Sequence, residues 1–220
     1  MGFIKQHIGE ELDVSKYFSN GNTAAEGTII NKSGDGYNMI YQSGDISYKI
    51  YEQCIGSYCN KIYGNGRTIS NYGCGPTAVS ILASGYYSNV TPLTVINDCK
   101  SITDIHGVGA WDSVQRYLNH YGFNYKDGGS WASTINSSSQ NEIINHLKSG
   151  KPVILLVHGT VSTDVGRGGP YTSHYITLLG INDKNKVFVG DPGSSWNHSY
   201  TTMDNLVNNA HPDKYFLVSR

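Results

Sequence analysis

The sequence predicts an α+β domain in which helices come first and an antiparallel sheet follows. Segments with apolar residues at helical spacing lie between residues 74 and 149, and short β-rich runs separated by turn residues follow from residue 152 onward. The length of 220 residues is that of one domain, with room for an appendage at most. This order argues against a doubly wound parallel sheet, in which strands and helices alternate along the chain.

Three helices are expected in the first part of this pattern. Residues 74–85 begin with a cysteine, place Pro76 in the first helical turn and reach a typical stop signal at Gly85. The apolar residues between these two ends are numerous enough for a short buried helix. The other two helices are expected over 109–121 and 139–149, and each ends next to a glycine.

The second part of the chain predicts a sheet. Four segments have the composition of strands: residues 152–158, 173–181, 186–191 and 214–218. Asn-Asp-Lys-Asn at 182–185 separates the middle two and is typical of a hairpin turn. Residues 202–209 are expected to form one or two helical turns. Residues 1–45 alternate short apolar patches with Gly, Ser and Asn, which indicates short strands joined by turns.

Composition and charge exclude several classes of protein. With 16 Lys and Arg against 17 Asp and Glu, and no cluster of basic residues, the chain lacks the charge that nucleic-acid binding requires. No apolar run approaches the roughly 18 residues of a membrane-spanning helix, so membrane insertion is not expected. The N-terminus carries Glu10, Glu11 and Asp13 where a signal peptide would be apolar. We therefore expect a protein that stays inside the cell, leaves it without a signal peptide, or has had its signal peptide removed.

Cys74 has the most distinctive position among the cysteines. A thiol at a helix N-terminus lies beside free N–H groups and the positive end of the helix dipole, which favour the thiolate. Gly73 and Gly75 leave the approach to its sulfur open. The remaining cysteines match no zinc template, and we expect them to be structural or incidental thiols: Cys54, Cys59 and Cys99. The Cys54 and Cys59 pair could also form a disulfide or contribute half of a metal site.

A cysteine nucleophile needs a histidine to share its proton and an Asp or Asn to orient the imidazole. His174 begins one predicted strand and Asp191 ends the next. If the turn is at 182–183, His174 and Asp191 lie directly opposite each other. If it is at 183–184, Asp191 pairs with residue 176, and His174 lies diagonal to Asp191 on the same face of the sheet. A loop of odd length would place the two side chains on opposite faces of the sheet.

The stretches that contain these residues resemble a known family. They are YEQ (51–53), YGNGRTISNYGCGPTAVSIL (63–82), GKPVILLVHG (150–159), SHYITLLGI (173–181) and VFVGDPG (187–193). Their combination and order are similar to those of the C39-like cysteine peptidases of the papain-like superfamily, which include bacteriocin-leader peptidases and peptidase domains of bacterial and phage cell-wall lytic proteins. The resemblance covers about residues 51 to 218, and it matches nothing in the N-terminal part.

The resemblance implies a papain-like fold and a set of roles. A helical half carries the cysteine and a C-terminal antiparallel sheet carries the histidine and the aspartate, within a catalytic domain of residues 46–220 on which an extension of residues 1–45 packs. Cys74 would be the nucleophile, His174 the general base and then acid, and Asp191 the residue that orients the imidazole. Gln53 would donate to the oxyanion together with the Cys74 N–H. Asn65 or Asn71 could fill the role of Gln53 instead. No cofactor is implied.

The leading hypothesis is a cysteine hydrolase that cleaves an amide bond through a thioester. Loops rich in Ser, Thr and Gly at 130–139 and 159–172 predict a polar cleft, which suits a peptidoglycan stem peptide or another polar peptide. A lysin-type cell-wall hydrolase that acts after release from the cell is therefore expected. Trp196 is expected either to shield the histidine–aspartate pair from water or to pack in the core.

Four alternatives remain. The same three residues would serve a protease that processes a leader peptide or another protein, or a transglutaminase-type acyl transfer. A third alternative is a papain-like module that binds without catalysing, in which Cys74 would be an ordinary thiol. The fourth is a metal site built from His158, His174, Asp191 and one cysteine, although these spacings match no ligand template.

Overall fold

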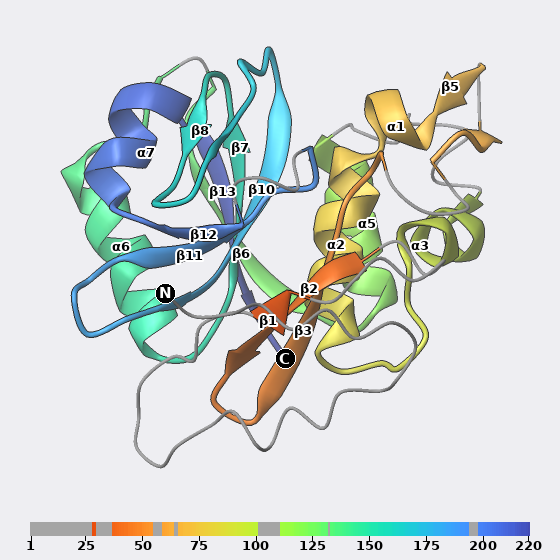
Figure 1. Ribbon diagram of the computed structural model, residues 1–220, viewed down its shortest axis with the longest axis horizontal. Coiled ribbons are helices and arrows are strands. Elements are labelled where there is room, and N and C mark those ends of the chain that lie inside the picture. Colours follow the sequence, from red (N-terminus) through yellow and green to blue (C-terminus); the bar gives the residue numbers. More distant parts are fainter. Residues whose placement is uncertain are drawn as a thin grey trace.

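The computed structural model describes residues 28–29, 37–54, 59–63, 66–100, 111–131, 133–193 and 198–220 (Figure 1). Its centre is a six-stranded sheet with the order β12-β11-β10-β7-β13-β6, in which every pairing is antiparallel. The strands of this sheet are β6 (Asn124–Gly129), β7 (Val153–Val157), β10 (His174–Ile181), β11 (Val187–Gly190), β12 (Ser199–Thr201) and β13 (Lys214–Ser219).

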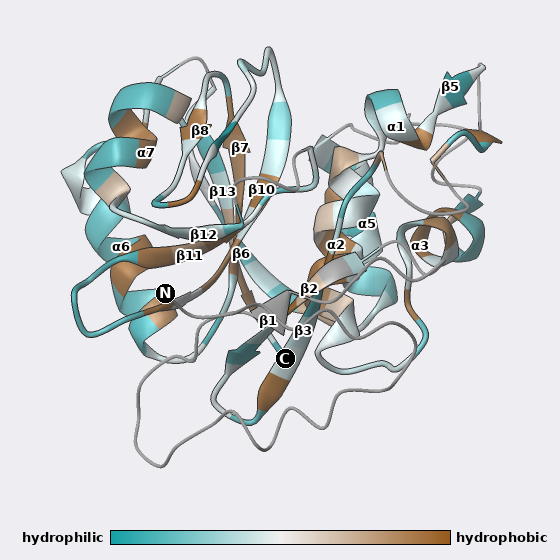
Figure 2. Cartoon of the chain, viewed as in Figure 1, coloured by the Kyte–Doolittle hydropathy of each residue, from teal (hydrophilic) through white to brown (hydrophobic). Residues whose placement is uncertain are grey.

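The central strands are buried on both faces. In β7, Ile154 and Leu156 belong to one hydrophobic cluster, and the residues between and beside them belong to the other. β13 alternates in the same way, with Phe216 in the first cluster and Leu217 in the second. Strands covered on both sides read as continuous apolar runs, which is why these segments were recognisable in the sequence. Figure 2 shows the hydrophobic residues on these strands.

Helices cover both faces of the sheet (Figure 1). α2 (Cys74–Ser84) and α5 (Trp111–His120) contribute to the first cluster, and α6 (Ser137–Lys148) and α7 (Met203–Ala210) contribute to the second. The predicted α+β class is confirmed, with a helical half that carries Cys74 and a C-terminal antiparallel sheet that carries His174. One difference from the expected order is that β6, a strand of this sheet, precedes α6 in the chain.

The remaining elements lie outside the six-stranded sheet. They are β1 (Thr28–Ile29), β2 (Tyr37–Ser43), β3 (Ile46–Tyr51), β4 (Ile62–Tyr63), β5 (Arg67–Thr68), α1 (Ile69–Tyr72), α3 (Pro92–Asp98), β8 (Val161–Ser162) and β9 (Arg167–Gly168). The strands among them form a three-stranded sheet of β1, β2 and β3 and two small pairs, β4–β5 and β8–β9. None of the helices in the described ranges is long and apolar enough to cross a lipid bilayer.

Gly85 follows the last residue of α2, but its backbone does not adopt the left-handed conformation that often requires glycine at a helix end. Its φ of −70° is ordinary for a helix. A Cβ at this position would lie 2.6 Å from Cγ2 of Ile46 and 2.7 Å from Cε1 of Tyr48. The glycine therefore lets β3 pack directly against the end of the helix.

The expected division between residues 45 and 46 falls at the turn between β2 and β3, which pair along their whole length. Tyr41 of β2 is fully buried and stacks on Phe188 of β11, with ring centroids 3.8 Å apart. We propose that residues 37–45 pack on the catalytic domain as part of its first hydrophobic cluster. Most of the predicted extension lies outside the described residues.

Candidate active site

Cys74 is the first residue of α2 and is partly exposed. Its sulfur lies close enough to His174 and to the backbone N–H groups of Tyr175 and Gly75 for all three to act on it as hydrogen-bond donors. Burial alone would raise the pKa of the Cys74 thiol, but the hydrogen bond and the positive charge of His174, aided by the two N–H groups, lower this pKa below its ordinary value. The surroundings therefore favour a thiolate.

The loop that joins β10 and β11 is longer than the sequence predicts. Ile181 pairs with Val187, so five residues separate the two strands instead of two. This odd length alone would place His174 and Asp191 on opposite faces of the sheet. The predicted two-residue turn is therefore wrong.

A β-bulge restores the expected geometry. It lies directly after Leu178 and gives β10 one more residue than β11. Thr177 consequently pairs with Gly190. The next residue, Asp191, then lies on the same face as His174, in the diagonal arrangement that was the second of the two registers expected.

His174 and Asp191 form a buried pair. Nε2 of His174 lies 2.6 Å from Oδ1 of Asp191, which leaves Nδ1 as the ring nitrogen for the hydrogen bond to Cys74. Burial alone would lower the pKa of His174, but the Asp191 carboxylate and the Cys74 sulfur raise it to about 10. A lowered thiol pKa beside a raised imidazole pKa is the condition for a thiolate–imidazolium pair.

The Asp191 carboxylate is held by further donors. The N–H of Gly193 donates to Oδ1 at 2.8 Å, and the hydroxyl of Tyr171 donates to Oδ2 at 2.9 Å.

The backbone N–H of Asp191 donates to Nδ1 of His198 at 3.2 Å. Since that nitrogen accepts, Nε2 of His198 carries the proton and faces Oε1 of Glu52 at 3.5 Å.

Gln53 lies between the two halves of the site. Its backbone N–H donates to the carbonyl of Pro192, next to Asp191, at 2.8 Å. Its side-chain Nε2 donates to the carbonyl of Ser70 at 2.8 Å, in the short helix that leads to Cys74. A side-chain amide carries two protons, and within the described part of the chain only one of them has an acceptor. Among the other oxyanion candidates, Asn71 is exposed and Asn65 lies outside the described residues.

The other cysteines have separate surroundings. Cys99 is buried in the first hydrophobic cluster. Cys54 and Cys59 are free thiols, and Sγ of Cys54 donates to the carbonyl of Ser70 at 3.4 Å. Burial together with the neighbouring Cys59 raises the pKa of Cys54. No disulfide joins these two in the structure.

Of the residues in the alternative metal site, the structure brings Cys74, His174 and Asp191 together but places His158 with other partners. Nε2 of His158 lies 3.1 Å from Oδ2 of Asp213, and its Nδ1 lies 2.6 Å from the carbonyl of Thr172. His158 thus pairs with a different carboxylate from His174. Across the described ranges, no group of three or more His, Cys, Asp or Glu residues is arranged to hold a metal ion. Trp196 lies outside the described residues.

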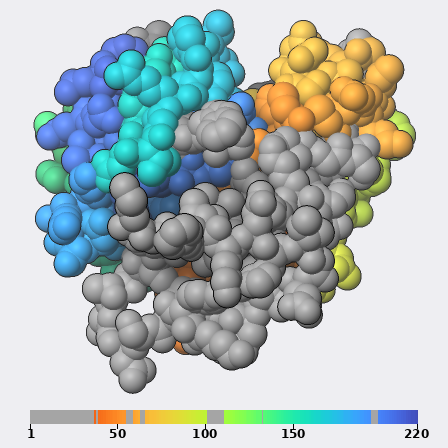
Figure 3. Space-filling model, viewed as in Figure 1, coloured from red at the N-terminus to blue at the C-terminus, as the bar shows by residue number. Residues whose placement is uncertain are grey.

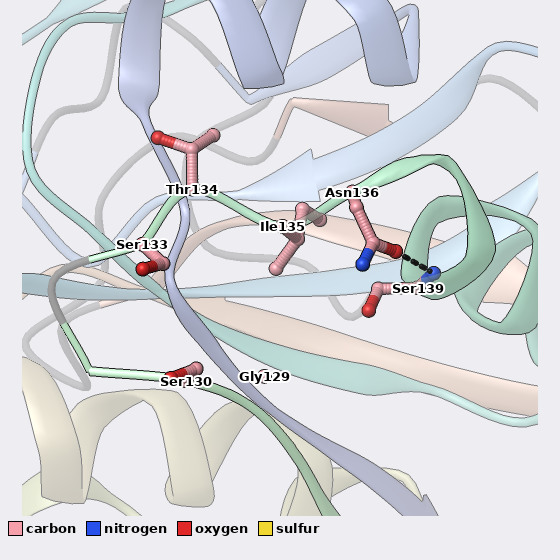
Figure 4. A pocket seen from close by; sticks show the side chains of 7 residues that line it. All are labelled: Gly129, Ser130, Ser133, Thr134, Ile135, Asn136 and Ser139. Carbon is pink, nitrogen blue, oxygen red and sulfur yellow. Dashed lines mark hydrogen bonds between the residues drawn. The ribbon is translucent and has the colours of Figure 1, made fainter.

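The surface is hollowed between the two halves of the molecule. Figure 3 shows a notch between the orange and yellow residues around α1 and the cyan residues around β8 and β9. A separate pocket of about 280 Å³ lies at the N-terminus of α6, and none of the four predicted site residues lines it. Five of its seven lining residues are Ser, Thr or Asn, and the carbonyl oxygen of the Asn136 side chain accepts the Ser139 N–H there (Figure 4).

Three residues of the site were not identified from the sequence. Tyr171 stands in a loop of Gly, Ser, Thr and Pro without any motif, and Glu52 and His198 are far apart in the chain. The only available signal was that Glu52 directly precedes the oxyanion candidate Gln53. Pairing of this kind depends on the fold and has no local pattern.

Residues 46–215 match the model of the Peptidase_C39 like family. The chain belongs to this family. The resemblance seen in the sequence is thereby confirmed, and the protein is a cysteine peptidase of the C39-like type. No curated protein matches the sequence.

Several solved structures are similar to this C39-like peptidase at low identity. The peptidase domain of Streptococcus ComA, a bi-functional ABC transporter involved in quorum sensing, has 15% identity and a TM-score of 0.47 over 73% of this chain and 98% of its own. A double glycine motif protease from an AMS/PCAT transporter, solved with its leader peptide, has 14% identity and a TM-score of 0.43 over 72% and 89%. The Pseudomonas avirulence protein AvrPphB has 12% identity and a TM-score of 0.36 over 68% and 93%.

Proposed function

We propose that this cysteine peptidase hydrolyses amide bonds with Cys74 as nucleophile, His174 as acid and base, and Asp191 as the residue that orients the imidazole. The observation that carries the proposal is the chain of contacts from the Cys74 sulfur through the imidazole of His174 to Oδ1 of Asp191. Such a chain supplies a nucleophile, a proton and a fixed ring orientation within one site.

The first half of the reaction forms a thioester. The Cys74 thiolate attacks the scissile carbonyl carbon, and the oxygen becomes an oxyanion. The N–H of Cys74, in the first turn of α2, and a proton on Nε2 of Gln53 are the proposed donors to this oxyanion. The tetrahedral intermediate collapses as His174 gives its Nδ1 proton to the leaving nitrogen, which departs as an amine.

The second half restores the enzyme. A water molecule gives a proton to Nδ1 of His174 and attacks the thioester carbon. The carbon–sulfur bond then breaks, which releases the carboxylic acid and returns Cys74 to the thiolate beside an imidazolium. Asp191 keeps its hydrogen bond to Nε2 throughout, so that Nδ1 is the nitrogen that exchanges protons.

We infer that the substrate is a polar peptide of the bacterial cell wall. Small polar residues that are at least partly exposed lie three and four positions before the nucleophile, Asn71 and Ser70, and directly before the base, Thr172 and Ser173. The exposed Tyr72 stands beside the first pair. A peptidoglycan stem peptide, with small and charged side chains, suits such a rim better than an apolar peptide. The proposal places the enzyme at the cell wall after release from the cell.

Purified peptidoglycan sacculi provide the test. We expect the wild-type protein to release new free amino groups, detected by dinitrophenylation, and soluble fragments whose masses by mass spectrometry identify one cleaved amide bond. New reducing sugar ends should not form, because the proposed site cleaves amides. Protein with Cys74→Ala, treated in parallel, should release neither product.

Two results would count against the substrate. In the first, sacculi of several cross-bridge types stay intact, while the wild-type protein, and not the Cys74→Ala variant, cuts leader-type peptides. This result would favour peptide processing instead. Equal release of amino groups by both proteins would contradict the role of Cys74 itself.

A further inference from the structure

Tyr171 contacts both members of the buried histidine–aspartate pair. Its ring stacks on the imidazole of His174, with centroids 3.9 Å apart and an angle of 18° between the planes. Its hydroxyl donates to Oδ2 of Asp191 at 2.9 Å. Its own position is set by the backbone, because its N–H donates to the carbonyl of Gly159 at 2.8 Å.

We propose that Tyr171 is a positioning residue of this peptidase: its hydroxyl fixes the carboxylate plane of Asp191, and its ring fixes the plane of the His174 imidazole that faces Cys74. The inference rests on the proposed roles of these three residues and adds a fourth to them. Tyr171 itself exchanges no proton with the substrate.

The hydroxyl acts on the carboxylate. Asp191 is fully buried, and its Oδ1 already receives donors from His174 and Gly193. Without Tyr171 the phenolic donor to Oδ2 is lost inside the protein, and a buried carboxylate oxygen that loses a donor is costly. Burial and the Asp191 charge also raise the pKa of the Tyr171 phenol, so it keeps its proton and remains a donor.

The ring acts on the imidazole. A flat aromatic face against an imidazolium is attractive and resists rotation of the ring out of its plane. The site leaves space for this stack, because a Cβ at Gly193 would lie 2.5 Å from the Tyr171 hydroxyl and 3.0 Å from Cε1 of His174. The ionisable groups that face the imidazole are Cys74, Asp191 and Tyr171, and Cys54 also lies close enough to act on the phenol.

Two substitutions separate these contributions. Tyr171→Phe keeps the stacked ring and removes only the hydroxyl, whereas Tyr171→Leu removes both. The matched control is Tyr121→Phe, because the Tyr121 hydroxyl also donates to an aspartate, Asp98 Oδ2, at 2.8 Å. The ring of Tyr121 lies 5.7 Å from that of Tyr87, just beyond the C-terminal end of α2, whereas Cys74 begins that helix.

Two readouts are measured on the full chain. The first is the rate of Cys74 alkylation by iodoacetamide from pH 5 to pH 10, which needs no knowledge of the substrate. We expect Tyr171→Leu to move the half-maximal pH up by about one unit, since the imidazolium loses its aromatic face. Tyr171→Phe should leave this pH close to the wild-type value, because the ring remains.

The second readout is the kcat and KM for release of amino groups from peptidoglycan. We expect Tyr171→Phe to lower kcat about tenfold with KM unchanged, since the loss affects orientation and not binding. Gly193→Ala, which pushes the tyrosine hydroxyl away, should lower kcat in the same way. Tyr121→Phe should stay within about twofold of wild type, as expected for a substitution remote from the chemistry.

The outcomes separate this inference from the proposed function. Wild-type alkylation and wild-type kcat in all Tyr171 variants, together with an inactive Cys74→Ala protein, would overturn the positioning role and leave the proposed function standing. If Tyr171→Leu fails to fold, wild-type kcat in both Tyr171→Phe and Gly193→Ala would also overturn the positioning role. A loss of kcat in Tyr121→Phe equal to that in Tyr171→Phe would overturn it as well. If Cys74→Ala digests peptidoglycan as wild type does, the proposed function fails, and the alkylation profile still decides the inference.

Discussion

Replacement of Cys74 by alanine is expected to abolish amide hydrolysis and to leave the fold intact. The side chain supplies the sulfur that contacts His174, so its removal takes away the bond-forming atom. In a hydrolase of this mechanism, loss of the nucleophile lowers kcat by about 10⁶-fold. The measurement is single-turnover hydrolysis of peptidoglycan, with circular dichroism to show that the fold persists.

The same substitution has a small structural cost. Cys74 is partly exposed at the first turn of α2, and alanine is the best helix former, so thermal unfolding should change little. Cys59→Ser is the matched control, since it alters another partly exposed thiol and should keep full activity. Activity of the Cys74→Ala protein above about a hundredth of wild type would contradict the nucleophile assignment.

Replacement of His174 by alanine is expected to lower hydrolysis nearly as much. The substitution removes the positive partner of the thiolate, the acid for the leaving amine and the base for water. Members of a catalytic set act as a unit, so a single loss costs about as much as losing all of them, on the order of 10⁵- to 10⁶-fold in kcat.

His158 provides the control for this second substitution. It also pairs with an aspartate, Asp213, and it follows β7, whose last residue Val157 pairs with His174. His158→Ala therefore removes a comparable histidine–aspartate contact from the neighbouring strand without touching the sulfur. We expect this variant to keep activity within a few-fold of wild type. Equal losses in both variants would show that the His174 effect is structural.

The sequence predicted the central strands better than the edges. β7 and β13 are covered on both faces, and their continuous apolar residues were sufficient to find them. β6 was missed because it is an edge strand whose residues, NYKDGG, are polar and mostly exposed. An edge strand of this kind has no composition that distinguishes it from a loop.

The contact between His174 and Asp191 shows a second limit. Its diagonal register was predicted from a two-residue turn, yet the structure reaches the same register through a five-residue loop and a β-bulge after Leu178. The one signal for the bulge was Gly180 within the predicted strand, since an isolated glycine in a strand often marks a bulge. Tyr171 was missed because only the folded loop brings it against the imidazole.

The catalytic roles depend on a thiolate at Cys74 stabilised by an imidazolium at His174. The His174 contact lowers the pKa of the thiol, and Asp191 with Cys74 raises the pKa of the imidazole to about 10. Below the lowered pKa of Cys74 the sulfur is protonated and unreactive, and above the raised pKa of His174 the positive partner is lost. The ion pair therefore exists between these two values.

The most direct measurement is the alkylation rate of each cysteine by iodoacetamide against pH, followed by mass spectrometry, in wild type and in His174→Ala. We predict that Cys74 of the wild type reacts far faster at pH 6 than Cys54, whose pKa is raised, and that His174→Ala removes this advantage. A Cys74 that reacts no faster than an ordinary thiol at pH 6, or equally fast without His174, would contradict the ion pair and the catalytic roles built on it.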